Sequence, residues 1–292
     1  MQKLIIPYSE FYITNVCNLS CNGCNRFNNY SFKGFQRWED YKDTYTQWSK
    51  EVDLKAVAIL GGEPLLNPTF MSWVMGVTAL WPDASVRIIT NGYQLQKVTG
   101  LYELLTSNNK IKLWVGIHNK KDKQRIVDQV KLFLTAPYDI SFNNEHQYQE
   151  FMLITDANNV TVRVEYNWWF HQGAIVKTDT GDTLHNSDPK KAHDICHMST
   201  CHHFIKGQLY KCGVVALLPE FDQQHTLALS DSDRQLMESY TPLDITADYK
   251  SKVNFINNLD KQIDQCKFCP EAYHGNQIYA QEKKVYKINT QL

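Results

Sequence analysis

The sequence predicts an α/β fold in which strands alternate with helices. Short apolar runs of strand character recur along the first 170 residues, and helix-like segments lie between them. Short motifs rich in cysteine, glycine and polar residues follow directly after the strands. In parallel α/β sheets, binding and catalytic sites lie at these carboxyl ends of the strands. Each parallel pairing needs a crossover, which a helix usually supplies. The pattern therefore indicates a mainly parallel sheet, either a partial or full α/β barrel or an open doubly wound sheet.

The individual elements follow from residue type and punctuation. Asn67 with Pro68 makes a favoured helix start, and Asn91-Gly92 closes a strand. We expect strands, rich in β-branched and aromatic residues, at Glu10–Thr14, Leu54–Leu60, Ser85–Thr90, Lys112–Ile117, Tyr138–Phe142 and Val160–Tyr166. We expect helices at Glu39–Lys50, Asn67–Trp81, Gln94–Thr106, Asp122–Leu134 and Glu145–Thr155.

Composition excludes several classes of protein. The chain has 292 residues, 43% of them hydrophobic, which suffices for a large core. It carries 30 basic and 31 acidic residues, unlike a dedicated nucleic-acid binder. The sequence contains no run of 18 apolar residues, so we expect no membrane span. Its first residues do not resemble a secretory signal. We therefore expect a cytoplasmic protein with no membrane partner.

Four regions are expected along the chain. Residues 1–170 contain the alternating strands and helices and are predicted to form the main domain. Residues 171–189 are polar, with Gly, Asp, Asn and Pro, and are predicted to be a linker. Residues 190–275 carry five cysteines and are predicted to form a small metal-stabilised module. Residues 276–292 are expected to be a C-terminal tail.

Eight cysteines fall into clusters at short spacing. Disulfides are rare in a reducing compartment, and short spacings are typical of metal or iron–sulfur ligation. The alternative is that some are ordinary buried apolar residues. The clusters are Cys17, Cys21 and Cys24, then Cys196, Cys201 and Cys212, then Cys266 and Cys269.

The first three cysteines suit an iron–sulfur cluster with an open iron. They lie at C-x3-C-x2-C spacing in one tight loop. A [4Fe-4S] cluster has four irons held by thiolates, so three protein ligands leave one iron free. A structural zinc site would need a fourth Cys or His close by, and the sequence offers none there.

This spacing after the first strand resembles the radical S-adenosylmethionine (radical SAM) superfamily. The resemblance implies that the open iron chelates S-adenosylmethionine (SAM), whose reductive cleavage yields a 5′-deoxyadenosyl radical. Two later turns resemble the GGEP and TNG motifs of the family. Glycines permit positive φ and close approach of the backbone to a ligand. The resemblance assigns SAM binding to Gly61, Gly62, Glu63, Pro64, Thr90 and Asn91.

The sequence offers few candidate catalytic residues. His118 ends the fourth strand, and Glu165 and Tyr166 lie on the last strand of the main domain, where alternation points only one of the two inward. We name His118 and Glu165 as weak candidates, because a polar residue with a structural partner is a real alternative. Trp168, Trp169 and Phe170 are expected either to cover the pocket or to pack in the core.

The later cysteines resemble the twitch module, the shortened form of the SPASM extension of radical SAM enzymes. The resemblance implies an auxiliary [4Fe-4S] cluster on Cys196, Cys212, Cys266 and Cys269, with Gly207 between the first two. A hairpin turning at Lys206-Gly207 would instead place Cys201 opposite Cys212. Five cysteines thus compete for four places. A four-cysteine zinc site is the alternative, with His193, His197, His202 and His203 nearby.

The sequence therefore predicts a partial (βα)6 TIM-like barrel with a small C-terminal iron–sulfur module. We expect a radical SAM oxidoreductase with two [4Fe-4S] clusters, which abstracts hydrogen from a substrate and oxidises it with help from the auxiliary cluster. The substrate would be a small molecule or a short peptide, and the reductant a flavodoxin or ferredoxin. The alternatives are a peptide maturase that forms cross-links, and a non-enzymatic iron–sulfur or zinc protein.

Overall fold

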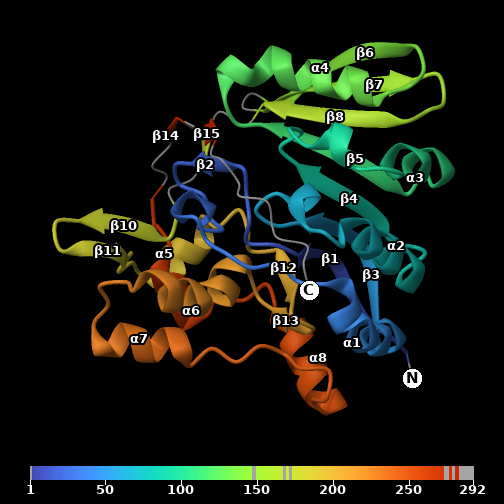
Figure 1. Cartoon of the computed structure of the whole chain (residues 1–292). Coiled ribbons are helices and arrows are strands. Elements are labelled where there is room, and N and C mark those ends of the chain that lie inside the picture. Colours follow the sequence, from blue (N-terminus) through green and yellow to red (C-terminus); the bar gives the residue numbers. More distant parts are fainter. Residues whose placement is uncertain are drawn as a thin grey trace.

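A nine-stranded sheet forms the centre of the molecule (Figure 1). The computed structural model describes residues 2–146, 149–166, 169–170, 173–272, 276–277 and 280–282. Six neighbouring strands of the sheet are parallel, so their carboxyl ends meet at one edge. In sheet order these are β12 (His202–Ile205), β1 (Leu4–Tyr12), β3 (Val52–Leu60), β4 (Ser85–Thr90), β5 (Ile111–Ile117) and β8 (Thr161–Tyr166).

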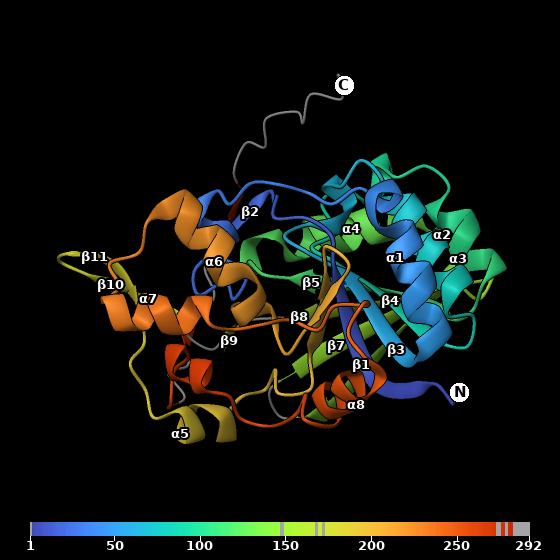
Figure 2. The same cartoon turned by 90° about the horizontal axis from the view of Figure 1, so that it is seen from below.

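Helices cover the sheet in two groups, as Figures 1 and 2 both show. The first group connects the parallel strands: α1 (Trp38–Glu51), α2 (Phe70–Leu80), α3 (Leu101–Ser107) and α4 (Lys123–Phe133). The second group lies toward the β12 edge: α5 (Pro189–Asp194), α6 (Gly213–His225), α7 (Asp231–Glu238) and α8 (Tyr249–Asn257). Short 3-10 turns are η1 (Asn28–Tyr30), η2 (Pro64–Leu66), η3 (Leu95–Lys97), η4 (Lys120–Asp122) and η5 (Asp264–Phe268).

The two faces of the sheet have different chemistry. In β4 and β8 every second side chain is fully buried, for example Val86 and Val162, and these residues join the core under the first group of helices. The residues between them, such as Arg87 and Arg163, are only partly buried and point to the opposite face. β4 and β8 therefore place apolar side chains under the first group of helices and charged side chains on the opposite face, whereas β1 and β3 also contribute apolar side chains to that opposite face.

The helix predicted over Glu145–Thr155 is wrong. The chain forms an antiparallel hairpin there, β6 (Tyr138–His146) and β7 (Gln149–Asp156), and β7 then pairs antiparallel with β8. The run Phe151–Thr155 is rich in residues that favour strands, and β7 completes the sheet beside β8. Four helical crossovers precede this hairpin, so the main domain is not six βα repeats.

The C-terminal half is joined to the main sheet. β12 pairs parallel with β1, with Glu10 opposite His203, and β13 (Gln208–Tyr210) returns antiparallel beside it. The predicted turn at Lys206-Gly207 is confirmed by this register. The segment expected to be a linker contains a second hairpin, β10 (Ile175–Thr178) with β11 (Gly181–Leu184).

Part of the expected C-terminal tail lies along the cysteine loop. β15 (Ala280–Glu282) pairs antiparallel with β2 (Leu19–Cys21), which places Ala280 opposite Cys21. β14 (Asn276–Gln277) pairs with β9 (Trp169–Phe170). Of the predicted aromatic cover, Trp168 lies outside the described residues, and only the strand position of its two neighbours is described.

Within the described residues, no helix combines the length and apolar character that a bilayer crossing requires.

Packing of α2 against α1 gives a stability prediction. A Cβ at Gly76 would overlap the ring of Trp38. Overpacking of this kind typically costs about 1–3 kcal/mol, so Gly76→Ala should lower the free energy of unfolding in urea by that amount. Met75→Ala is the control, because Met75 is 57% exposed on the same helix. Equal stability of the two variants would contradict the packing described here.

Candidate functional site

The first three cysteines lie in the loop that follows β1. Cys17 and Cys21 are each 9% exposed, and Cys24 is partly buried. The loop is fixed by hydrogen bonds to its own backbone and to the neighbouring turn. The Leu19 N–H donates to the Cys17 sulfur at 3.4 Å, and the Cys24 thiol donates to Asn28 Oδ1 at 3.5 Å.

The GGEP turn packs directly against this loop. The Gly62 N–H donates to Thr14 O at 2.7 Å, and the Glu63 N–H donates to Val16 O at 2.8 Å. A Cβ on Gly61 would lie 2.6 Å from Thr14 O, and one on Gly62 would overlap Val16 O. Neither glycine has positive φ. The two glycines are therefore required because the cysteine loop comes so close, rather than for an unusual backbone conformation.

Glu63 connects the GGEP turn to the TNG turn. Its carboxylate accepts from Thr90 Oγ1 at 2.7 Å, from the Asn91 N–H at 2.8 Å and from the Leu65 N–H at 3.1 Å. The residue is fully buried and does not line the cavity described below. Glu63, which the resemblance assigned to SAM binding, is thus placed here as a positioning residue that holds two turns together.

Asn91 connects the TNG turn to the cysteine loop. Its Nδ2 donates to Asn18 Oδ1 at 2.8 Å and lies 3.9 Å from the Cys17 sulfur, while its Oδ1 accepts from the Tyr93 N–H. The three motifs that follow β1, β3 and β4 therefore form one hydrogen-bonded unit.

A cavity of about 290 Å³ lies where these motifs meet. The backbone of Gly61 and Gly62 forms one side of it, and Trp114 and Gly116 of β5 form another. Other residues that line it are Cys17, Cys21, Cys24, Arg26, Thr90, Asn91, His118 and Glu165. The structure thus brings together the cysteines, two of the four expected positions of the GGEP turn, both expected positions of the TNG turn, and both candidate catalytic residues. Pro64 is buried in η2 and does not line the cavity.

His118 and Glu165 both face this cavity, and Tyr166 is buried in the core on the other face. Burial lowers the pKa of His118 to about 4, so its imidazole is neutral at neutral pH. Glu165 forms an ion pair with Arg163, whose Nε lies 2.5 Å from Oε1. The guanidinium of Arg163 also stacks on Trp114 at 4.5 Å.

A buried charged group that the sequence analysis missed lies beside the cavity. Glu10 of β1 is 4% exposed and accepts from Tyr8 OH at 2.9 Å. Arg26 Nη2 lies 2.7 Å from Glu10 Oε2, and His203 Nε2 lies 2.8 Å from the same oxygen. Burial opposes ionisation, yet His203 and Arg26 outweigh it and hold the pKa of Glu10 well below its usual range. The sequence did contain one indication of this buried group, because Glu10 is a charged residue within the apolar sequence of β1.

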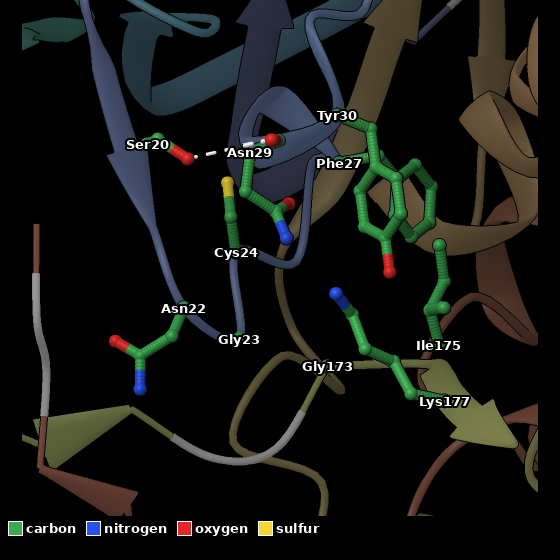
Figure 3. Close-up of a pocket in the computed structure, with 10 residues that line it drawn as sticks. All are labelled: Ser20, Asn22, Gly23, Cys24, Phe27, Asn29, Tyr30, Gly173, Ile175 and Lys177. Atoms are coloured by element: carbon green, nitrogen blue, oxygen red, sulfur yellow. Dashed lines mark hydrogen bonds between the residues drawn. The ribbon is translucent and has the colours of Figure 1, made fainter. Parts of the chain in front are cut away.

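A second cavity, of about 400 Å³, borders the cysteine loop (Figure 3). Cys24 lines both cavities. Lys177 of β10 extends its ammonium toward the ring of Tyr30, with Nζ 5.7 Å from the ring centre. Phe27 lines this second cavity and packs against Phe221, with ring centres 4.7 Å apart. Phe27 is therefore part of the second cavity and is not among the residues that line the first cavity.

Four of the five later cysteines form a group. Cys269 interacts electrostatically with Cys212, Cys196 and Cys266, and burial raises its pKa well above the usual value. Burial likewise raises the pKa of Cys212 to about 11. The four lie at the end of α5, the start of α6 and the 3-10 turn η5. A buried thiol becomes a thiolate readily only beside positive charge, which a bound metal centre supplies.

Cys201 has different partners from these four cysteines, although it too interacts electrostatically with Cys196. Its thiol hydrogen-bonds Glu10, and burial raises its pKa to about 12. The hairpin argument that placed it opposite Cys212 does not apply, because the β12–β13 pairing ends at Tyr210 and Cys212 already precedes α6. Within the described ranges, no three His, Cys, Asp or Glu side chains are grouped so that they could hold a metal ion, and this holds for a zinc site and for both cysteine sets alike.

Two sequence comparisons match this chain. The family described as a 4Fe-4S single cluster domain matches residues 10–151. GTP 3',8-cyclase of Aliarcobacter butzleri (strain RM4018) is 28% identical over 95 residues, which make up 32% of this chain. The family match covers just under half of the chain and includes the first three cysteines, the GGEP turn and the TNG turn. The match to the cyclase spans 29% of the length of that enzyme, so it says nothing of cyclase activity in this chain.

Solved structures with bound S-adenosylmethionine give weaker likenesses. SuiB of Streptococcus suis bound to S-adenosylmethionine is 18% identical, with a TM-score of 0.37 over 45% of this chain and 32% of SuiB. Native anSMEcpe with bound AdoMet and Cp18Cys peptide is 19% identical, with a TM-score of 0.33 over 44% and 40% of the two chains. Because both TM-scores are below 0.5, we draw no functional conclusion from them.

The environment of Glu63 gives a prediction for pH dependence. Burial raises its pKa from 4.5 to about 7, against the opposing effect of its hydrogen bonds to Asn91, Thr90 and Leu65. Between pH 4.5 and about 7 the Glu63 carboxyl keeps its proton in the folded protein and loses it in the unfolded chain. The free energy of unfolding therefore falls as pH rises. The free energy of unfolding of the parent, relative to Glu63→Gln, should fall by about 1.4 kcal/mol per pH unit from 4.5 to 7. Urea titrations across this range measure it, and a constant difference would contradict the raised pKa.

Proposed function

We propose that this protein uses a [4Fe-4S] cluster held by Cys17, Cys21 and Cys24 to cleave SAM and generate a radical. The observation that carries the proposal is the convergence of the cysteine loop, the Gly61-Gly62 backbone and Asn91 on one cavity. These groups come from the ends of three neighbouring parallel strands. Such an edge is where ligands of parallel sheets bind.

The donor set fits the cluster. Three thiols come from one loop, and the loop sequence from Asn15 to Tyr30 contains no fourth Cys and no His that could ligate the remaining iron. When bound, the cluster would pass one electron to SAM, which would split into methionine and a 5′-deoxyadenosyl radical that takes a hydrogen atom from the substrate. The protein's own part is to hold the cysteine loop against the GGEP turn and to leave the Gly61-Gly62 backbone facing the ligand.

The net reaction we propose is a substrate oxidation. After loss of a hydrogen atom, the substrate radical would release one electron and one proton. The neutral imidazole of His118 is the candidate proton acceptor, and Glu165 is the second candidate. The electron acceptor would be a second [4Fe-4S] cluster in the twitch-like module. Cys196, Cys212, Cys266 and Cys269 are its proposed ligands, supported by their mutual electrostatic interactions.

The proposal also includes an electron donor and a substrate. A flavodoxin or ferredoxin would supply the first electron. The substrate would be a small molecule or one residue of a short peptide, because a cavity of about 290 Å³ has to admit the reacting group beside SAM.

Loss of one cysteine of the first set should abolish radical formation. Cys24→Ala removes a thiolate ligand, so 5′-deoxyadenosine release from SAM under a strong reductant should fall to background, measured by chromatography after anaerobic reconstitution. Cys201→Ala makes the same chemical change outside both ligand sets and should still release the product. Release from Cys24→Ala at the parental rate would contradict the proposal.

The iron content tests the second cluster separately. Two four-iron clusters require about eight irons per chain. Cys269→Ala should retain about four irons, those of the first cluster, whereas Cys201→Ala should retain about eight. If Cys201→Ala loses iron and Cys196→Ala does not, Cys201 is the ligand and the assignment of Cys196 is wrong.

A further inference from the structure

Lys211 is a buried lysine that directly precedes Cys212. It is 5% exposed, and its Nζ donates to Leu259 O at 2.6 Å. Its backbone N–H donates to Tyr240 OH at 2.8 Å, and its carbonyl oxygen lies 2.8 Å from His202 Nδ1. The ammonium is therefore fixed in the interior by contacts at both the main chain and the end of the side chain.

No carboxylate forms an ion pair with Lys211 among the residues the structure describes. The other buried lysine, Lys252, pairs with Glu51 at 2.7 Å. The Lys211 ammonium donates instead to a neutral carbonyl, that of Leu259. A buried ammonium is costly unless an anion compensates for the lost hydration, and burial accordingly lowers the pKa of Lys211, so a nearby anion would stabilise its charged form.

Three cysteines and one carboxylate surround Lys211 electrostatically, and Cys212 is its neighbour in the chain. Its ammonium interacts electrostatically with Cys212, Cys266 and Cys196, and more weakly with Asp260. Backbone N–H groups converge on the same sulfurs. Val215 and Val214 donate to Cys212, Met198 donates to Cys196, and Ile263 donates to Cys266. Positive charge and N–H dipoles thus surround one group of thiols, an arrangement that stabilises thiolates bound to metal.

We propose that Lys211 is the counter-charge of an anionic [4Fe-4S] centre held by Cys196, Cys212, Cys266 and Cys269, and that its ammonium raises the reduction potential of that centre. This inference rests on the auxiliary cluster of the proposed function. Reduction adds one electron to the centre and breaks no bond. A fixed positive charge nearby favours the more negative, reduced form, which makes the centre a better electron acceptor.

Lys211→Met tests the charge in the full-length reconstituted protein. Methionine keeps an unbranched apolar side chain of similar reach but removes the ammonium. The midpoint potentials of both clusters are measured by redox titration monitored by electron paramagnetic resonance. The second cluster should shift to a more negative potential, while the first cluster should not change. Lys211→Arg keeps the charge and should stay near the parental value.

Lys252→Met is the matched control, because it also removes a buried ammonium but one paired with Glu51. It should move neither potential. If Lys211→Met prevents assembly of the second cluster while Lys211→Arg permits it, the requirement for positive charge is again supported. Loss of the cluster in both variants would overturn the inference, because shape rather than charge would then be decisive.

The inference and the proposed function fail in different ways. If the parent protein binds only about four irons, it has no auxiliary cluster. That result would overturn both the auxiliary cluster of the proposed function and the role of Lys211. A parent with about eight irons and an unchanged midpoint potential in Lys211→Met would leave the auxiliary cluster standing. It would overturn only the role assigned to Lys211.

Discussion

The buried carboxylate of Glu63 is the interaction on which the arrangement of the site depends. It accepts hydrogen bonds from the TNG turn, while the backbone N–H of the same residue donates to the cysteine loop. One residue therefore fixes the loops that follow β1, β3 and β4 relative to each other. Because it is fully buried, water does not compete for these bonds. The cavity and the exposed backbone of the two glycines follow from this fixed geometry.

The parallel sheet provides the second level of organisation. Its outer face is an apolar core under the first four helices, and its inner face carries Glu10, Arg87, Arg163 and Glu165. Charged side chains at these positions would be unfavourable in a closed core, but they pair with each other and with aromatic rings beside the cavity. The addition of β12 next to β1 brings His203 and Cys201 to the same region. The two cysteine sets thus belong to one connected structure.

The sequence predicted the first four parallel strands and the positions of their motifs, because apolar runs separated by helices have few alternative topologies. It did not predict the β6–β7 hairpin, since the run around Phe151 is compatible with either a buried helix or a strand. It could not separate Cys196 from Cys201, because the strand pairing that aligns Cys201 with Cys212 ends two residues early. The charged group at Glu10 was also missed, since its partners Arg26 and His203 are distant in sequence. Only the folded chain brings them together.

The central claim is that one iron of the first cluster has no protein ligand and binds SAM directly. Electron–nuclear double resonance of the reduced protein with SAM labelled with 15N at its amino group tests this most directly. The account predicts a hyperfine coupling between the cluster and that nitrogen, which is lost in Cys17→Ala. A reduced cluster that shows no coupling to bound SAM, or a native protein that contains zinc and no iron, would contradict it.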